Sequence, residues 1–210
     1  MPGRAAHASR RLSGVSAIEK FLPLFAALRR LEAERNAVKH PLTTRWDLPL
    51  SIEIGTVGAG EWASSVPDLL TAEGRMGVAL GEDPAAARRA LEEAIAATCA
   101  DDPWLRDHPA RVQWWGGQFA PGLTDVDAEI LRVVRRAHAA VSPQPQGTWA
   151  TPYGSDLRLM HGIGGVPTVH YGPGDVRLAH GPAESVEIAE VLTATRALAL
   201  AVLDHCGVST

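Results

Sequence analysis

The sequence carries eight histidines, the first residues to consider for metal binding or acid–base chemistry. No two of them have the spacing of a helical metal site, and neither H-E-x-x-H nor Cys-x-x-Cys occurs. A single histidine is more often a solvated residue, or a core residue whose ring is hydrogen-bonded, than a metal ligand. His180 is an exception, because it lies in a loop ahead of a predicted helix, with Glu184 able to supply a carboxylate near the N-terminus of that helix. Loops at strand ends meet in the cleft of α/β folds, so His180 is the best metal-ligand candidate.

Three further features could contact a substrate. In Gly172-Pro173-Gly174-Asp175 the glycines would let a ligand approach the backbone, although a plain turn explains the same residues equally well. Asp156 and Arg158 stand two residues apart and fit a surface or interdomain ion pair. Arg75 interrupts a strand-like apolar run, where a lone arginine usually lies on the exposed face.

Composition and charge exclude several classes of partner. The 210 residues are 46% hydrophobic and 21% charged, which is typical of a globular chain rather than a disordered or coiled-coil one. A net charge of −4 leaves no basic surplus for nucleic acid, and basic residues are not interleaved with the six tryptophans. No apolar run has the roughly 18 residues of a membrane helix, and the N-terminus does not resemble a secretory signal. Two distant cysteines make no disulfide framework. We therefore expect a cytoplasmic protein without nucleic-acid or membrane partners.

The first half of the chain predicts alternating helices and strands. Ser16 and Glu19 have capping-box spacing at the start of a helix that reaches about Val38, with Pro23 inside it. The remaining expected elements are strands over Leu48–Val57 and Leu70–Leu80, a helix over Asp83–Thr98 and a strand over Arg111–Phe119. With a first strand near Gly3, this order is that of a ferredoxin-like sandwich.

Pro121-Gly122 marks the expected boundary of a second domain. Beyond it we expect a helix capped by Asp125, a strand within Val166–Gly172 and a helix from about Glu184 to Cys206. These roughly 90 residues hold fewer strands than a three-layer α/β domain needs, so the second domain looks incomplete.

Four segments, taken in order, resemble one family of metallopeptidases: GRAAHASRRLSGVSAIEK, WASSVPDLLTAEGRMGVALGEDP, YGSDLRLM and VPTVHYGPGDVRLAHGPAESV. The family includes acetylornithine deacetylase, succinyl-diaminopimelate desuccinylase, aminoacylase and glutamate carboxypeptidase. The resemblance implies a mixed α/β (α+β) fold, in which a ferredoxin-like dimerisation domain is inserted into a zinc-peptidase-like α/β sandwich. Residues 1–120 would be the dimerisation (lid) domain, forming a homodimer, and residues 121–210 the C-terminal portion of the catalytic domain.

The resemblance also implies residue roles. His7 corresponds to a catalytic histidine that enters the partner subunit's active site and helps to hold the developing oxyanion. Arg75 corresponds to an arginine that binds the substrate carboxylate, a task suited to a guanidinium. Gly172 and Gly174 fall on the substrate-binding loop. Ser64 is a substrate-binding position where many relatives have asparagine.

The implied activity is hydrolysis of N-acyl amino acids or small peptides by a pair of divalent metal ions, usually zinc, with cobalt or manganese as alternatives. His180 corresponds to the last metal ligand. The family's other ligands and its Glu-Glu general base precede the dimerisation domain and are absent from this sequence; Glu92-Glu93 lies on a dimerisation-domain helix instead. A catalytic zinc needs about three protein ligands. We therefore expect that this chain alone neither holds the metals tightly nor hydrolyses amides.

Two functional classes remain open. The first is the C-terminal portion of an amidohydrolase, as a fragment, a truncated gene prediction or half of a split enzyme that needs an N-terminal catalytic half. The second is a non-catalytic dimerisation or ligand-binding module derived from such an enzyme. The presence of His7, Arg75 and His180 in one chain favours the first class, because a pure dimerisation module does not need a histidine that binds metal. The expected first strand at Met1–Arg4 also favours reading the chain as half of a larger enzyme.

Overall fold

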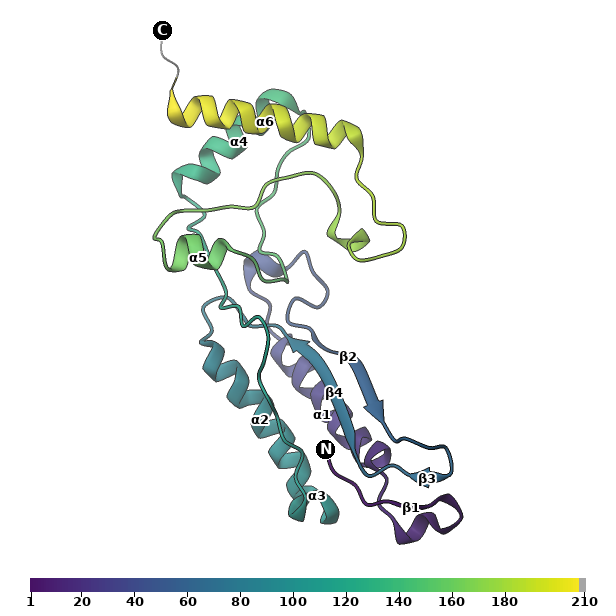
Figure 1. Cartoon of the computed structure of the whole chain (residues 1–210). Helices are drawn as coiled ribbons and strands as arrows, with labels where there is room; N and C mark the ends of the chain where they lie inside the picture. Colours follow the sequence, from purple (N-terminus) through teal and green to yellow (C-terminus); the bar gives the residue numbers. More distant parts are fainter. Residues whose placement is uncertain (208–210) are drawn as a thin grey trace. The chain divides into compact units, whose positions relative to one another are not determined.

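The computed structural model describes residues 1–207, which divide into two compact units. Unit 1 comprises residues 1–121 and 151–154, and unit 2 comprises residues 122–150 and those from 155 onward. The elements of unit 1 are β1 (Ala6–His7), η1 (Ala8–Ser13), α1 (Ala17–Arg35), η2 (Pro41–Thr43), β2 (Ile52–Ala59), β3 (Ser65–Val66), β4 (Leu70–Met76), α2 (Pro84–Asp101) and α3 (Pro103–Asp107) (Figure 1). Those of unit 2 are α4 (Glu129–Val141), α5 (Leu157–Gly162), η3 (Val176–Leu178) and α6 (Ile188–Cys206).

Helix α1 begins with half of the predicted capping box. The Ser16 hydroxyl accepts the backbone N–H of Glu19 at 3.3 Å. The Glu19 carboxylate pairs with Arg11 at 3.0 Å. Pro23 lies inside α1, yet the helix continues to Arg35. The proline therefore costs the helix a backbone hydrogen bond without ending it.

Helices α2 and α3 begin with the same Asp-Pro pair. Asp83 accepts the N–H of Ala85 at 3.0 Å, as the sequence predicts. Asp102 accepts the N–H groups of Trp104 and Leu105 at 2.9 and 3.0 Å. In each pair the proline occupies the first turn, where its missing N–H costs nothing. Asp102 also pairs with Lys20 at 2.7 Å, which connects α3 to α1.

Strands β2 and β4 form an antiparallel hairpin whose register runs from Ile52 opposite Met76 to Ala59 opposite Leu70. The register shifts between Ile54 and Thr56, so Gly55 lies at a β-bulge. The two strands approach closely at Gly74, where a Cβ atom would lie 2.1 Å from the Glu53 carbonyl oxygen. Glycine at position 74 is therefore a packing requirement.

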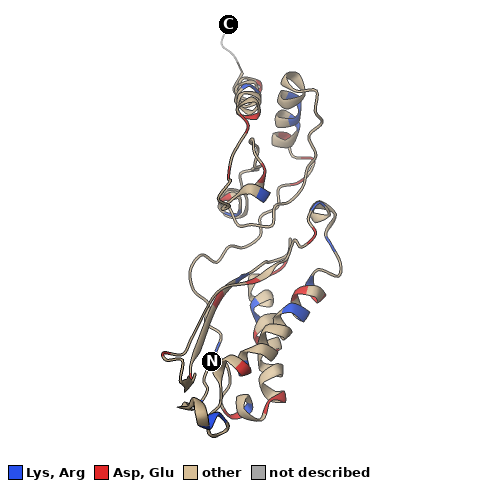
Figure 2. Cartoon of the chain, turned by 90° about the vertical axis from the view of Figure 1, so that its right-hand side faces the viewer, with Lys and Arg blue, Asp and Glu red and all other residues tan. Residues whose placement is uncertain are grey.

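The core of unit 1 lies between this hairpin and the helices. Its buried members are Leu24, Leu28, Leu31, Ile52, Ile95, Cys99 and Leu105. Ile95 is buried and Leu91 packs against the same cluster, so this face of α2 is directed toward the core. Figure 2 shows α1 and α2 on one side of the strands, with acidic and basic residues mixed over the helices.

The expected strand over Arg111–Phe119 is not formed, since the structure assigns no strand to these residues. Such a strand would pair with the N-terminal segment, and for this it needs backbone groups there that are still free. In that segment, however, the Arg4 N–H donates to the Val15 carbonyl at 2.8 Å, and the Arg4 carbonyl accepts the Val15 N–H at 2.9 Å. The segment contacts α2 through side chains, and the Trp114 indole N–H donates to Glu92 at 2.6 Å. Packing on a helix has thus replaced strand pairing.

In unit 2, α4 and α6 pack together through a small cluster of Val133, Ala137 and Ala201. Helix α4 begins later than expected, because the Asp125 carboxylate caps a turn by accepting the N–H of Asp127 at 2.9 Å. Helix α6 ends at Cys206 and Gly207 (φ 75°) follows as its C-cap, as the sequence predicts.

The expected strand within Val166–Gly172 is also not formed, and residues 122–207 contain no strand. The Thr124 hydroxyl donates to the Thr168 carbonyl at 2.5 Å and accepts the Thr168 N–H at 3.2 Å. A side chain thus satisfies backbone groups that a neighbouring strand would otherwise pair with. Across the described residues, no helix combines the length and apolarity needed to cross a membrane. The protein is of mixed α and β structure, with its strands in unit 1.

Candidate functional site

The pairing of β1 with β3 brings His7 close to the segment that carries Ser64. His7 lies opposite Ser65, and the Ala8 N–H donates to the Ser64 carbonyl at 2.9 Å. The imidazole is exposed and meets the Trp62 indole edge-on, with 6.4 Å between ring centroids. Two candidate residues far apart in the sequence are therefore neighbours in unit 1.

The His7 ring is oriented by its own loop. Its Nδ1 accepts the backbone N–H of Ser9 at 3.2 Å and lies 2.9 Å from the Ser9 hydroxyl. Because Nδ1 accepts, the neutral ring carries its proton on Nε2. His7 can thus donate a hydrogen bond from Nε2 to an incoming acceptor.

Arg75 lies in β4 opposite Glu53 of β2, with an exposed side chain. One of its terminal nitrogens, Nη2, donates to the Pro152 carbonyl at 2.8 Å. Residues 151–154 belong to unit 1, so this contact lies within that unit. A substrate carboxylate would compete with a backbone carbonyl for this nitrogen.

The candidate loop of unit 2 is held by carboxylates near the start of α6. The Gly174 N–H donates to Glu190 at 2.9 Å, and φ at Gly174 is 96°. The backbone N–H of His180 donates to Glu184 at 3.1 Å. Gly172, Gly174 and His180 are all exposed and belong to the same stretch around η3. The Glu184 carboxylate thus contacts the backbone of His180.

His180 also has an unusual backbone conformation. Its φ of 61° makes it the one non-glycine residue with positive φ among residues 1–207. Such a conformation is disfavoured for a side chain with a Cβ, although histidine adopts it more readily than most.

A buried polar network in unit 2 escaped the sequence analysis. His138 of α4 is 5% exposed, and its Nδ1 lies 2.7 Å from the Tyr171 hydroxyl. Its Nε2 lies 3.0 Å from the Gln144 carbonyl, and burial raises the pKa of Tyr171. The network joins α4 to the residue that precedes Gly172. The available signal was the spacing of His138 seven residues after Leu131, on the buried face of α4.

The described residues do not assemble a metal site. Among residues 1–207, no three histidine, cysteine, aspartate or glutamate side chains cluster closely enough to hold a metal ion. The Glu92-Glu93 pair is exposed on α2, where Glu92 accepts the Trp114 indole N–H. His180 alone therefore does not fit the metal pair that the family resemblance implies.

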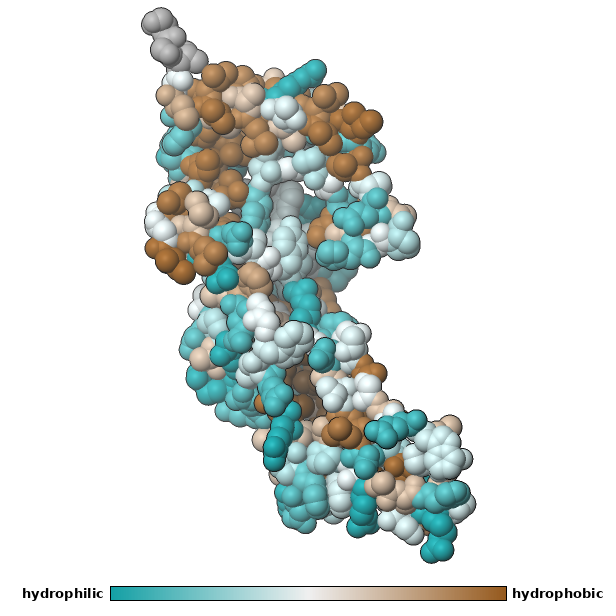
Figure 3. All heavy atoms as spheres, in the orientation of Figure 1, coloured by the Kyte–Doolittle hydropathy of each residue, from teal (hydrophilic) through white to brown (hydrophobic). Residues whose placement is uncertain are grey.

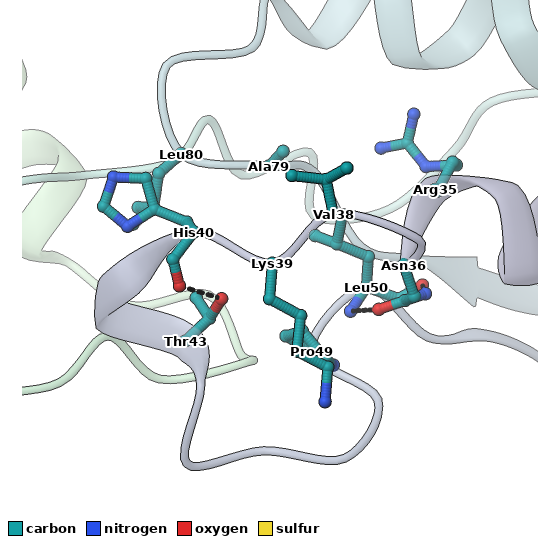
Figure 4. Close-up of a pocket in the computed structure, with 10 residues that line it drawn as sticks. All are labelled: Arg35, Asn36, Val38, Lys39, His40, Thr43, Pro49, Leu50, Ala79 and Leu80. Carbon is teal, nitrogen blue, oxygen red and sulfur yellow. Dashed lines mark hydrogen bonds between the residues drawn. The ribbon is translucent and has the colours of Figure 1, made fainter.

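Unit 1 contains a cavity of about 120 Å³ between the end of α1, residues 38–50 and residues 79–80 (Figure 4). Figure 4 shows Arg35, Lys39 and His40 around it. The Arg35 guanidinium pairs with Glu82 at 2.7 Å, and Lys39 donates to the Trp46 carbonyl at 2.7 Å. None of the six candidate site residues lines this cavity, so we assign it no ligand.

The chain is similar to known proteins along almost all of its length. Residues 1–103 match the family described as the peptidase dimerisation domain. N-formyl-4-amino-5-aminomethyl-2-methylpyrimidine deformylase of Halalkalibacterium halodurans is 24% identical, over 95% of this chain and 48% of its own length. A protein of Aspergillus niger named probable carboxypeptidase is 29% identical, over 92% of this chain and 42% of its own.

A solved structure supports the same grouping at the level of fold. A tripeptidase of Staphylococcus aureus is 14% identical with a TM-score of 0.61, covering 96% of this chain and 48% of that one. The chain thus spans about half the length of the relatives it matches. These matches show that residues 1–103 carry the dimerisation domain of the M20 peptidases, and that the chain as a whole is similar to members of this family over about half of their length.

Proposed function

We propose that the chain is the dimerisation and C-terminal catalytic portion of a cytoplasmic, metal-dependent amidohydrolase acting on N-acyl amino acids or small peptides. The ferredoxin-like dimerisation domain would span residues 1–120, and the C-terminal portion of the α/β sandwich residues 121–210. The observation that carries the proposal is the match over more than nine-tenths of the chain to a deformylase and a carboxypeptidase.

The exposed polar candidates fit substrate binding. Arg75 would bind a substrate carboxylate, exchanging the Pro152 carbonyl for a charged acceptor that it binds more strongly. His7 would donate from Nε2 to an oxygen that becomes negative in the partner subunit's site. The backbone around Gly172 and Gly174 leaves room for a ligand, since no atom beyond the adjoining residues lies within 3.4 Å of a Cβ built at either position.

The chain lacks most of the metal ligands that the complete activity requires. His180 would supply one ligand to a metal, while a catalytic zinc needs about three protein ligands and an open position. No cluster in residues 1–207 supplies the others. We therefore propose that this chain alone is inactive. The same observation supports the second candidate function, a non-catalytic dimerisation or ligand-binding module.

We also propose a homodimer formed through residues 1–120. Helix α1 buries Leu24, Leu28 and Leu31 but exposes a second apolar stripe of Ile18, Leu22 and Phe25. Strand β2 pairs with β4 along one edge, and no other described strand pairs with its second edge. An apolar helix stripe and an unpaired strand edge are both surfaces that a second copy would cover.

Metal analysis and turnover of the full chain test the proposal. The purified chain should hold less than one equivalent of zinc and should not hydrolyse N-acyl amino acids with added zinc, cobalt or manganese. Two equivalents and turnover would contradict our assignment of incompleteness. The DNA sequence immediately upstream of the coding region distinguishes the two candidate functions. An in-frame stretch encoding His-x-Asp and Glu-Glu supports the enzyme, and its absence supports the module.

A further inference from the structure

Arg75 lies on the face of the β2–β4 hairpin that is turned away from the core of unit 1. Side chains alternate between the two faces of a strand, and in β4 Leu70 is buried while Met76 packs against the core cluster. Arg75, one position before Met76, is exposed. In Figure 3, hydrophobic residues form only small patches over unit 1 and gather instead over α5 and α6. The chemistry available at Arg75 is therefore that of its charge and its N–H donors.

Arg75 binds a neutral acceptor although a carboxylate lies opposite it. Glu53 of β2 is the cross-strand partner of Arg75, a position where opposite charges usually interact. The Glu53 carboxylate instead accepts the Ile54 N–H at 3.1 Å and lies 3.9 Å from a terminal nitrogen of Arg29. Arg75 Nη2 donates to the Pro152 carbonyl at 2.8 Å. An ionised acceptor would bind the guanidinium more strongly than this carbonyl does.

The Pro152 carbonyl belongs to a short segment that returns to unit 1. Thr151–Gly154 is part of unit 1, whereas the residues on either side of it belong to unit 2. The Phe119 ring lies against this segment, since a Cβ atom built at Gly154 would be 2.8 Å from the Phe119 Cγ. The Arg75 bond and the Phe119 contact therefore both hold residues 151–154 in unit 1.

The Pro152 bond uses the nitrogen that a carboxylate needs. A guanidinium holds a carboxylate by two parallel bonds along one of two edges, Nη1/Nη2 or Nε/Nη2, and both edges include Nη2. We infer that Arg75 is a latch on residues 151–154, closed by the Pro152 carbonyl and released when a ligand carboxylate takes its place. A ligand shifts such an equilibrium only by binding one state better, and a carboxylate binds the guanidinium better when Nη2 is free. The inference deepens the proposed function, on which it rests, by giving carboxylate binding at Arg75 a conformational consequence.

Cleavage by chymotrypsin after Tyr153 reports on the latch in the full chain. Tyr153 is 42% exposed, and a protease cuts a segment that is held in place only when the segment opens. Trp62, which is 67% exposed between β2 and β3, supplies an internal reference cut. The probe is N-acetylglycine, titrated into the millimolar range, and the control at matched ionic strength is N-acetylglycinamide, which lacks the carboxylate. We expect N-acetylglycine to raise the ratio of the Tyr153 cut to the Trp62 cut by about threefold or more, and the amide to leave it unchanged.

Substitutions separate the latch from a general loosening of the chain. Arg75→Met should give the high ratio without ligand and no response to N-acetylglycine, whereas Arg30→Met, at an exposed position of α1, should behave as the wild type. Arg75→Lys keeps the charge and a donor for Pro152 but not the two-donor edge, so its ratio should stay low and respond weakly. If Arg75→Met misfolded, the wild-type titration and Arg75→Lys would still test the inference.

The NMR signal of the Arg75 Nε–H distinguishes this inference from the proposed function. A shift of that signal with N-acetylglycine at an unchanged cleavage ratio would overturn the latch and leave carboxylate binding at Arg75 in place. Equal ratios in ligand-free Arg75→Met and wild type, or no response of either signal, would also overturn the latch. A ratio that rises as expected would uphold it even where metal analysis and turnover contradict the proposed function.

Discussion

The carboxylate of Glu32 in α1 accepts the backbone N–H of Ile52, the first residue of β2, at 2.5 Å. Glu32 is 7% exposed, and its other oxygen pairs with Arg29 at 3.1 Å. Since Ile52 belongs to the core, this bond fixes the start of the hairpin against α1. Buried N–H groups without an acceptor are costly.

Replacing Glu32 with alanine should therefore destabilise unit 1. Leaving the Ile52 N–H and the Arg29 guanidinium without this partner should lower the free energy of unfolding by about 1–3 kcal/mol. Urea denaturation of the full chain measures the change. Glu34→Ala, at an exposed position on the same helix, should change it by less than about 0.5 kcal/mol. Equal effects of the two substitutions would show that the buried bond contributes nothing.

Acid should weaken unit 1 through two carboxylates. A hydrogen bond from Arg35 lowers the pKa of Glu82. Burial acts to raise the pKa of Asp102, but bonds from Lys20 and from the N–H groups of Leu105 and Trp104 lower it overall. A carboxyl with a lowered pKa in the folded state stabilises the fold above its unfolded value, near 4, and loses that contribution as the pH falls through the folded value.

Thermal melts between pH 7 and pH 3 check this dependence. The wild-type chain should lose stability below about pH 4.5, and Glu82→Gln should be less stable at pH 7 but lose less on acidification. Glu61→Gln, at an exposed position, serves as the control and should follow the wild-type curve. If the melting temperature of Glu82→Gln fell with pH as steeply as that of the wild type, Glu82 would be excluded as a source of the acid sensitivity.

The His138–Tyr171 bond should contribute coupled stability to unit 2. Tyr171→Phe removes the hydroxyl beside His138 Nδ1, and His138→Leu removes the ring. Each single substitution should destabilise unit 2 by about 1–3 kcal/mol, and the double variant by less than their sum. Hydrogen exchange in α4 and at residues 142–147 measures the loss. Strictly additive effects would contradict a direct interaction.

The exposed stripe on α1 should support dimerisation. Leu22→Glu places a charge where a second copy would bury an apolar side chain. We expect the dissociation constant of the dimer to rise at least tenfold, equivalent to about 1.4 kcal/mol. Light scattering after size exclusion measures the mass. Arg30→Glu changes charge at an exposed position of α1 away from the stripe and should leave the mass unchanged. A dimer that tolerates Leu22→Glu would have its interface elsewhere.

Local signals predicted the elements whose ends are determined by nearby residues. Ser16, the Asp83-Pro84 pair and Gly207 each begin or end a helix as expected, because capping depends on atoms only a few residues away. The two missing strands show the limit of this approach. A strand requires a partner edge, and the residues of Arg111–Phe119 do not by themselves reveal that Val15 already pairs with Arg4.

The sequence named candidate site residues, and their roles stay predictions; it did not predict the contacts of these residues. It offered Arg75 and His180 as candidates, yet it did not reveal that Arg75 would contact Pro152, 77 residues away. Nor did it reveal that Glu184 would bind the backbone of His180. Such contacts depend on how loops return to an element, which spacing along the chain does not specify.

The positive φ of His180 allows the role of its side chain to be separated from the conformation of its backbone. Glycine adopts this φ without the cost that a Cβ atom brings, so His180→Gly should leave the backbone of the loop unstrained. A loss of ligand binding in that variant would then report on the imidazole alone.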